Sequence, residues 1–132
     1  MDKKILVVDD EEVICSMLEQ AFGKAGYIVR TAESAEQAME FLREDSIMVM
    51  YLDLNLPGMD GIELCKKLRI QNPLSIMHAL TGYVDLFGLL DCRLAGFDDF
   101  FTKPVSIELL LESAKEAFKK LERWQVDEFD LV

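Results

Sequence analysis

Short apolar runs alternate with longer segments of helical periodicity along the chain. The run Ile5–Val8 is branched and continuously apolar, as in a strand that is buried on both faces of a parallel sheet. In the segment that follows, apolar residues recur about every 3.6 residues, which is typical of a helix with one buried face. Gly26 stands where a left-handed residue would end this helix. The pattern therefore predicts one strand and one helix before residue 27.

The same alternation continues toward the end of the chain. Further apolar or branched runs predict strands over Tyr27–Thr31, Ile47–Leu54, Ser75–Leu80 and Asp98–Phe101. Helical spacing between them predicts helices that begin after Ser34 and that cover Ile62–Arg69, Asp85–Ala95 and Ser106–Arg123. The segment Leu56–Gly61 has the composition of a turn-rich loop. Ser34 and Gln37 have the spacing of a capping box. Five strands that alternate with five helices favour an α/β fold, a doubly wound five-stranded parallel sheet with helices on both faces.

The composition limits the classes of protein to which the chain can belong. Its 132 residues fit one domain, and 51% hydrophobic with 30% charged residues is the balance of a globular protein. The net charge of −11 makes direct binding to nucleic acid or to an anionic membrane unfavourable. The longest apolar run, Ile47–Leu52, has six residues, whereas a membrane span needs about 20.

The three cysteines indicate a reducing compartment. Cys15, Cys65 and Cys92 are odd in number, lie far apart and form no CxxC motif, so we interpret them as reduced thiols of a core. We expect no signal peptide, because only four apolar residues separate Lys4 from the next aspartates. We therefore expect a cytoplasmic protein.

Residues capable of chemistry follow four of the five predicted strands. They are Asp9 and Asp10, Asp53, Thr81, and Lys103. In doubly wound sheets the carboxyl ends of the strands lie at one edge, where ligands bind. Neighbouring carboxylates repel one another unless a cation lies between them, and Mg²⁺ prefers such oxygen ligands. A magnesium ion and a lysine together suit a phosphoryl group. In the alternative interpretation, Asp9 and Asp10 cap the first helix and Lys103 forms a surface ion pair.

Four segments resemble the receiver domains of response regulators in two-component signalling, and single-domain chemotaxis regulators in particular. They are Leu6–Asp10, Leu52–Gly61, Leu80–Gly82 and Ala95–Pro104. The resemblance extends from Lys4 to about Leu121 and implies a flavodoxin-like fold with strand order 2-1-3-4-5. Residues 1–123 would form the receiver domain, and residues 124–132 a C-terminal tail or linker stub.

The resemblance also implies a phosphorylation site that contains a metal ion. Asp53 would accept a phosphoryl group from a sensor histidine kinase or a phosphotransfer protein. Asp10, Asp53 and the backbone carbonyl of Asn55 would bind Mg²⁺, and Asp9 would contact the ion directly or through water. The domain would not be an enzyme on other substrates, because it would assist only its own phosphorylation and dephosphorylation.

A switch is implied as well. Lys103, expected before a cis peptide bond to Pro104, would pair with the phosphoryl oxygens, and the Thr81 hydroxyl would hydrogen-bond the attached group. Movement of Thr81 would let Phe100 turn from an exposed to a buried position and change the surface for a downstream protein target. Without the resemblance, Phe100 is simply a core residue of a short strand. Tyr83 would shield the phosphoryl group from water.

Two other segments leave alternatives open. The predicted helix Asp85–Ala95 has more apolar residues than one buried face needs and contains Gly88, which costs about 1 kcal/mol relative to alanine. It either packs further into the core or contacts a partner, including a homodimer partner through the fourth helix, fifth strand and fifth helix. Residues 124–132 either extend the last helix, dock to a partner or begin a linker.

Rival functions fit the residues less well. A phosphatase of the haloacid-dehalogenase type needs a second aspartate two residues after its nucleophile, where this chain has Asn55. A flavin carrier would have a Ser/Thr- and Gly-rich phosphate loop after the first strand, and a GTPase would have GxxxxGK[ST]. The remaining alternative is a pseudo-receiver, a protein-binding module that is not phosphorylated. Such modules usually lack one of the acidic residues or the lysine, and this chain retains them.

Overall fold

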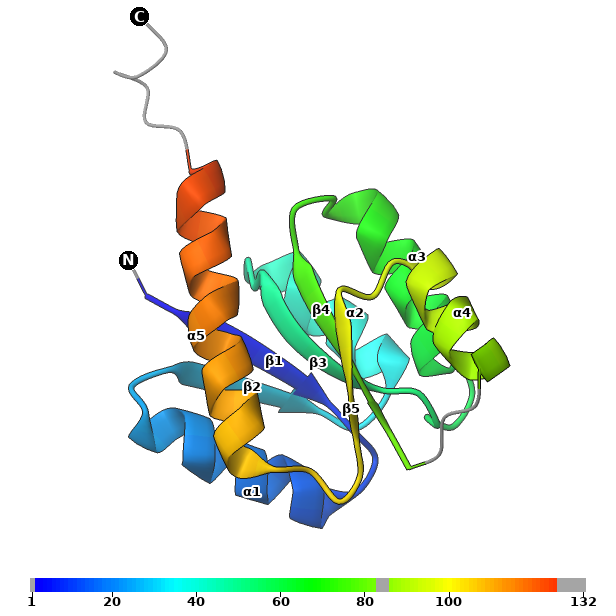
Figure 1. Ribbon diagram of the computed structural model, residues 1–132, viewed down its shortest axis with the longest axis horizontal. Coiled ribbons are helices and arrows are strands. Elements are labelled where there is room, and N and C mark those ends of the chain that lie inside the picture. The colour runs from blue at the N-terminus through cyan, green and yellow to red at the C-terminus, as the bar shows by residue number, and fades with distance from the viewer. Residues whose placement is uncertain (1, 83–85, 126–132) are drawn as a thin grey trace, which may run out of the picture.

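A computed structural model of the protein describes residues 2–82 and 86–125. Its five strands form one parallel sheet in the order β2–β1–β3–β4–β5 (Figure 1). The strands are β1 (Lys4–Val8), β2 (Ile28–Ala32), β3 (Val49–Asp53), β4 (Ile76–Thr81) and β5 (Asp99–Thr102). The predicted α/β fold and its strand order are confirmed.

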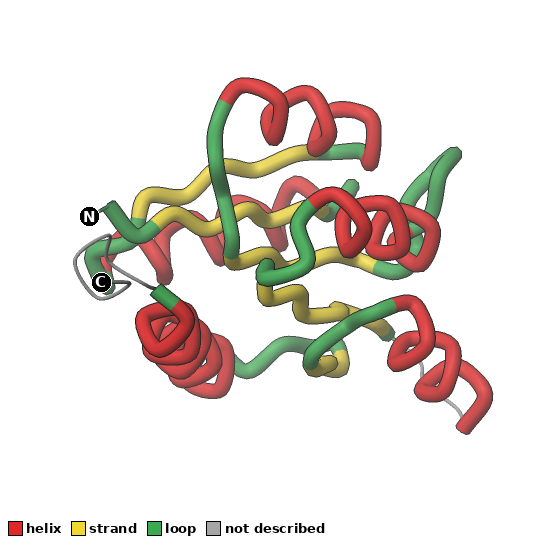
Figure 2. The backbone as a smooth tube through the Cα atoms, turned by 90° about the horizontal axis from the view of Figure 1, so that it is seen from above, coloured by secondary structure: helices red, strands yellow, loops and turns green. Residues whose placement is uncertain are grey.

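Five helices cover the two faces of this sheet. They are α1 (Glu12–Lys24), α2 (Ala35–Glu44), α3 (Gly61–Gln71), α4 (Leu86–Ala95) and α5 (Ile107–Trp124). Helices α1 and α5 pack on one face, and α2, α3 and α4 pack on the other, as the view in Figure 2 shows. Each face therefore has its own apolar layer.

Burial on both faces explains the continuously apolar strands. Ile5 and Val7 of β1 face the layer beneath α1 and α5, whereas Leu6 and Val8 face the layer beneath α2, α3 and α4. All four residues have no exposed surface. Because successive side chains of a strand point to opposite faces, a strand covered on both sides cannot carry polar residues at alternate positions.

Three helices begin at polar caps that the chain supplies locally. The side chains of Ser34, Asp60 and Ser106 accept hydrogen bonds from backbone N–H groups three residues on. The predicted capping box differs in one bond, because Gln37 Oε1 accepts from the N–H of Glu33 rather than of Ser34. Gly26 has φ of 96° after the end of α1, as its position predicted.

The observed ends of several elements differ by one or two residues from the predicted ends. The reason is that a residue can be buried without being part of a paired strand. Ile47 is 2% exposed, as its apolar character indicated, but β3 begins only at Val49. Strand β2 likewise covers Ile28–Ala32 in place of the predicted Tyr27–Thr31. Apolar character predicts burial, whereas the strand is defined by its backbone hydrogen bonds. The predicted start of the fourth helix at Asp85 lies outside the described residues.

The three cysteines are reduced and buried. Cys15 belongs to the layer beneath α1 and α5, and Cys65 and Cys92 belong to the opposite layer. Burial is the main cause that raises the pKa of Cys15 to about 11 and of Cys65 to about 12, and it also raises the pKa of Cys92. None of the helices in the described ranges combines the length and apolar composition that crossing a membrane would require.

Candidate functional site

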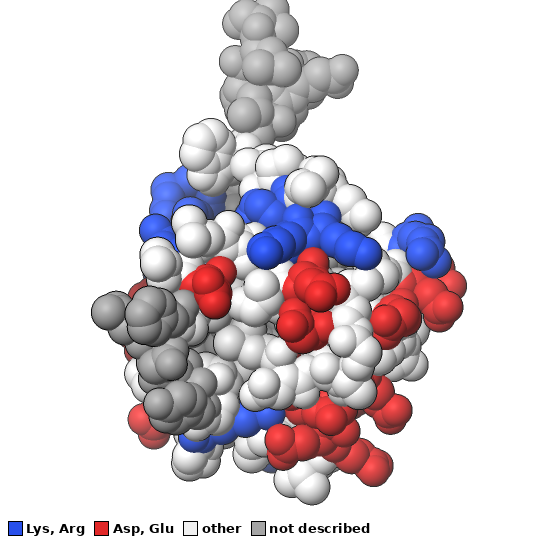
Figure 3. All heavy atoms as spheres, turned by 90° about the vertical axis from the view of Figure 1, so that its right-hand side faces the viewer, with Lys and Arg blue, Asp and Glu red and all other residues white. Residues whose placement is uncertain are grey.

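The carboxyl ends of the parallel strands bring distant polar residues to one edge of the sheet. Val8 pairs with Leu52, Asp53 with Leu80, and Thr81 with Thr102. Asp9 therefore follows directly beside the end of β3, and Lys103 follows directly beside the end of β4. In the space-filling view of Figure 3, acidic side chains gather in the lower part of the molecule, the end toward which these strands run in Figure 1.

Lys103 is the centre of an acidic cluster at this edge. Its Nζ lies 2.9 Å from Asp9 Oδ2, 3.2 Å from Glu11 Oε1 and 3.5 Å from Asp53 Oδ2. The side chain of Lys103 is 15% exposed, that of Asp9 is 0% exposed and that of Asp53 is 4% exposed. One ammonium group thus faces two buried carboxylates, and the local charge is negative even after the ion pairs form.

The Asp53 carboxyl is held between opposing influences. Burial raises its pKa, and the negative charges of Asp9 and Asp10 act in the same direction. The backbone N–H of Asn55, which donates to Asp53 Oδ1 at 3.1 Å, and the charge of Lys103 oppose this rise. The pKa of Asp53 remains above its ordinary value, so the site carries an electrostatic cost that a further cation would relieve.

The Lys103 ammonium is stabilised in its charged form. Burial alone would lower the pKa of this group, but the adjacent Asp9 carboxylate, followed by Asp53 and Glu11, raises it. The lysine therefore stays protonated and presents a permanent positive charge beside Asp53.

One carboxylate oxygen of Asp9 is buried against the Lys103 ammonium. Its Oδ1 accepts a hydrogen bond from the Glu11 N–H at 2.9 Å, which places it at the start of α1. Its Oδ2 is buried, and the contact with Lys103 Nζ brings opposite charges together without hydrogen-bond geometry. In the described part of the chain this oxygen has no hydrogen-bond partner. A buried carboxylate oxygen of this kind is suited to a cation.

The carboxylates fit a hard divalent ion. Asp9, Asp10 and Asp53 each offer one oxygen, and these oxygens all lie within 4.8 Å of one another. Asp9 and Asp53 are buried, whereas Asp10 is exposed, so the cluster opens toward solvent on one side. Mg²⁺ binds few carboxylates and keeps several water ligands, which this half-open arrangement allows.

Gly61 determines how closely α3 approaches the end of β3. Its N–H donates to Leu54 O at 3.2 Å, and a Cβ atom at this position would lie 2.2 Å from the backbone oxygen of Asp53. A side chain there would therefore push the start of α3 away from β3 and displace the residues around Asp53. The sequence indicated only a turn at Gly61, since a close approach of backbones has no signal in residue patterns.

The other predicted site residues lie around this cluster. Thr81 is 2% exposed and its carbonyl accepts from the Lys103 N–H at 2.7 Å. Phe100 is 39% exposed on β5, and the peptide bond between Lys103 and Pro104 is cis, as expected. Among the described residues, none has an atom within 4 Å of a Cβ atom built at Gly82. Tyr83, predicted to shield the site, lies outside the described residues.

Glu11 is a member of the site that sequence reasoning did not assign. It was placed in the acidic run behind Asp9 and Asp10 without a role, and its contact with Lys103 joins residues 92 positions apart. The acidic run was the available signal, but the choice among its carboxylates depends on the turn at the start of α1. Glu11 is largely exposed, whereas Asp9 is fully buried.

Comparisons with known proteins identify the same kind of domain. The family profile described as the response regulator receiver domain matches residues 5–131. The chain is 41% identical over 106 residues to the alkaline phosphatase synthesis transcriptional regulatory protein PhoP of Bacillus subtilis. The matched residues make up 80% of this chain and 44% of that protein. It is 36% identical over 106 residues to a cyclic di-GMP phosphodiesterase of Thermotoga maritima, and this match covers 80% of this chain and 28% of that protein. The chain thus spans less than half the length of these relatives.

Solved structures agree with the sequence matches. A CheY-like response regulator receiver domain protein from Methanospirillum hungatei has a TM-score of 0.87 and 30% identity, with 93% of this chain and 99% of that chain covered. Chemotaxis protein CheY4 of Vibrio cholerae has a TM-score of 0.84 and 27% identity, with 89% and 99% covered. Fold, profile and sequence identity agree, and the chain belongs to the response regulator receiver domain family.

Proposed function

We propose that this receiver domain is a switch that accepts a phosphoryl group on Asp53 from a sensor histidine kinase or a phosphotransfer protein. The observation that carries the proposal is the environment of Asp53 at the end of β3. Its carboxylate is buried, lies 3.5 Å from the Lys103 ammonium and shares a cluster with Asp9 and Asp10. Membership of a family of regulatory signalling domains supports the same interpretation.

The transfer would exchange one bond to phosphorus for another. An oxygen of the Asp53 carboxylate attacks the phosphorus atom of a phosphohistidine, the new O–P bond forms, and the P–N bond breaks with its electron pair left on the imidazole. Lys103 is already charged and close to Asp53, so it neutralises negative charge on the phosphoryl oxygens.

The metal ligands would be Asp9, Asp10, Asp53 and the backbone carbonyl of Asn55. Mg²⁺ bound there would supply positive charge to the transferring phosphoryl group. The buried Oδ2 of Asp9 supports the assignment, because it belongs to a buried excess of negative charge that the single Lys103 ammonium does not neutralise. Asp9 and Asp53 are held in place by the Glu11 and Asn55 N–H groups, so the carboxylates are oriented before an ion arrives.

The output would follow from Thr81 and Phe100. The Thr81 hydroxyl binds the phosphoryl group, and Phe100, now 39% exposed, turns inward toward the vacated space. Leu90 and Leu94 of α4 are exposed, and they would belong to the output surface of α4, β5 and α5. This surface would bind a downstream protein target or a second copy of the domain. The protein would act in the cytoplasm as a regulator, with residues 1–123 as the receiver domain and 124–132 as a tail or linker stub.

Intact-mass measurement after incubation with acetyl phosphate tests the proposal. We expect a phosphoryl adduct on the wild type that depends on Mg²⁺ and that is lost in Asp53→Asn. Asp91→Asn, which changes an exposed aspartate of α4, is the matched control and retains the adduct. A folded wild type that forms no adduct with acetyl phosphate or with phosphoramidate would contradict the proposal and favour the pseudo-receiver, a protein-binding module that is not phosphorylated.

A further inference from the structure

An apolar groove lies at the edge of the sheet where the strands begin, away from the acidic cluster. It has a volume of about 730 Å³ and runs between the start of β1, the loop before β4 and the last turns of α5. Residues from the beginning of β1 and from the last turns of α5 both line the groove, and in Figure 1 β1 begins beside α5. The residues that supply its apolar walls are Met48, Leu74, Phe118, Leu121 and Trp124.

Two of the side chains that line the groove are unusually exposed for large apolar residues. Trp124 is 63% exposed and Leu74 is 54% exposed. Phe118 is more firmly fixed, because its ring stacks on Tyr27 with centroids 5.2 Å apart and Lys3 Nζ lies 5.8 Å from the ring centroid. The groove is thus a preformed apolar surface with a rigid floor and an exposed rim.

The charge at the rim differs from that of the whole chain. Lys3 and Lys4 lie at the groove beside Asp2 and Glu122, so these four side chains are balanced although the chain carries a net charge of −11. Lys3 is 50% exposed, and its contact with Glu122 Oε1 is long, at 3.8 Å, so its ammonium is available to another carboxylate. An acidic residue of a docked apolar segment would therefore find a partner in Lys3.

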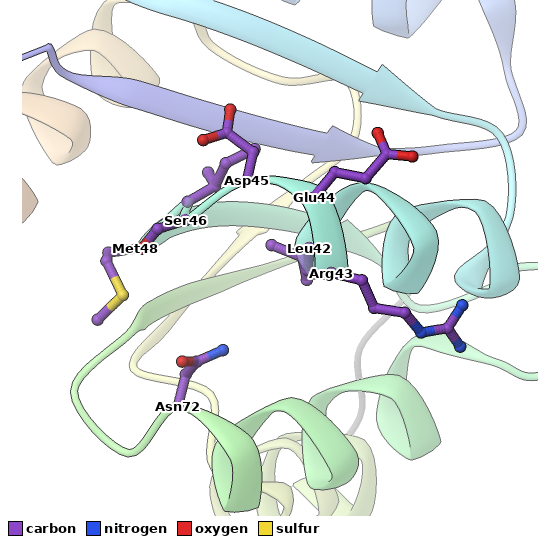
Figure 4. Close-up of a pocket in the computed structure, with 8 residues that line it drawn as sticks. Leu42, Arg43, Glu44, Asp45, Ser46, Met48 and Asn72 are labelled. Carbon is purple, nitrogen blue, oxygen red and sulfur yellow. The ribbon is translucent and has the colours of Figure 1, made fainter.

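A neighbouring hollow does not share these properties. It measures about 250 Å³, is lined mainly by polar residues from the end of α2 and touches the groove at Ser46 and Met48. In Figure 4 the side chains of Arg43, Glu44 and Asn72 point in different directions. Polar groups that diverge in this way do not define a ligand, and the apolar groove is the stronger surface.

The chain itself supplies a segment that matches the groove. After Gln125, which lines the groove, seven residues follow, Val126–Val132. They combine four apolar side chains with three acidic residues, Asp127, Glu128 and Asp130. Seven residues reach roughly 23 Å when extended, and they start at the groove, so the tether gives a high effective concentration.

We propose that the segment Val126–Val132 docks into the apolar groove at the amino end of the sheet, with Phe129 and Leu131 against Leu74 and Trp124. Burial of these side chains provides the driving force, and Lys3 lies where it can meet an acidic residue of the segment. The proposal is independent of phosphorylation at the opposite edge. It assigns to the tail one of the three possibilities that its sequence left open, with the domain itself as the partner.

Trp124 reports directly on this docking, because it is the single tryptophan of the chain. With the segment docked, acrylamide quenches Trp124 weakly and its emission lies at shorter wavelength than that of a solvent-exposed indole. We expect the double variant Phe129→Ser/Leu131→Ser to increase the quenching constant and to shift the emission to longer wavelength. Both substitutions lie beyond α5, so they leave the core intact.

A second pair of variants tests the groove itself. Leu74→Asp places a carboxylate against the acidic segment and should give the same increase in quenching, with no further increase when the tail variant is added. Ile70→Asp is the matched control, because Ile70 is 82% exposed and does not line the groove. It should leave Trp124 unchanged.

Three results would overturn the proposal. Equal quenching of Trp124 in the wild type and the tail variant would show that the segment does not cover it. An effect of the tail variant without an effect of Leu74→Asp would show that the segment covers Trp124 from outside the groove. Quenching that depends on protein concentration would assign the groove to the tail of a second copy.

Discussion

The two ends of the sheet each hold a lysine–aspartate pair, and the pairs differ in what surrounds them. At the amino end, Lys4 Nζ lies 2.6 Å from Asp45 Oδ1, with 31% of each side chain exposed. At the carboxyl end, Lys103 Nζ lies 2.9 Å from Asp9 Oδ2, with 15% and 0% exposed. The longer contact is the more consequential one, because water screens the first pair and is excluded from the second.

The same difference separates a structural contact from a site. Asp45 pairs with Lys4, and this hydrogen bond is the main cause that lowers its pKa. Asp9 and Asp53 compete for one ammonium group, and burial raises the pKa of Asp53. An excess of buried negative charge is therefore the feature that distinguishes the carboxyl edge of the sheet, for which we propose cation and phosphoryl binding, from an ordinary ion pair.

The largest effect is expected from Lys103→Met. This change leaves two buried carboxylates without their cation and should lower the free energy of unfolding by about 3 kcal/mol at neutral pH. Urea unfolding in buffer free of divalent ions measures it. The comparison between the two ends would fail if Lys103→Met cost no more than the corresponding change at Lys4.

The next largest effect is expected where the backbones of α3 and β3 approach each other, at the carboxyl end of the sheet. Gly61→Ala would place a Cβ atom 2.2 Å from the Asp53 backbone oxygen, and we expect a loss of about 2 kcal/mol from this overpacking. Gly23→Ala in α1 is the control, because a Cβ atom there meets nothing within 4 Å. It should stabilise the protein by about 0.5 kcal/mol. If urea unfolding gave similar free energies of unfolding for both variants, the close approach of the α3 and β3 backbones at Gly61 would be refuted.

A smaller, pH-dependent effect is expected from Asp53→Asn. Because the folded-state pKa of Asp53 is raised, the folded protein holds the proton more tightly than the unfolded chain. The wild type therefore loses stability as the pH rises from about 3.9 through the raised folded value. The variant lacks this loss, so it should equal the wild type below this window and exceed it above. Thermal unfolding of both proteins across this pH range, in metal-free buffer, measures the effect. A stability difference between variant and wild type that does not change with pH would contradict the prediction.

The smallest effect is expected from Lys4→Met. Its pair with Asp45 is partly exposed on both sides, so removal should cost under about 1 kcal/mol and the cost should shrink with added salt. Urea unfolding at low and high ionic strength measures both quantities. A loss that salt does not change would indicate that this pair is shielded from water and would weaken the contrast between the two ends.

Sequence patterns predicted the site because of how a parallel sheet is built. Each strand showed its apolar run, and the residue after each run had to lie at the same edge, so Asp9, Asp53, Thr81 and Lys103 could be brought together in advance. The ends of the strands were less accurate. Ile47 is buried without belonging to the paired strand, and the two properties look alike in a sequence.

Contacts that depend on local turns could not be predicted. Glu11 reaches Lys103 because the chain turns before α1, and the acidic run alone does not distinguish Glu11 from Glu12. Gly61 was assigned to a turn, but its role is to let two backbones approach. Both are three-dimensional relations between residues whose types have no distinctive pattern.

The buried thiols make each layer of the protein accessible to kinetic measurement. Cys15, on α1, faces the apolar layer between the sheet and helices α1 and α5. Cys65, on α3, and Cys92, on α4, face the layer on the opposite side of the sheet. Since the thiolate is the reactive form and burial raises the pKa of all three, alkylation at neutral pH requires that a layer opens. Mapping which cysteine is alkylated first would rank the opening rates of the two layers without any introduced label.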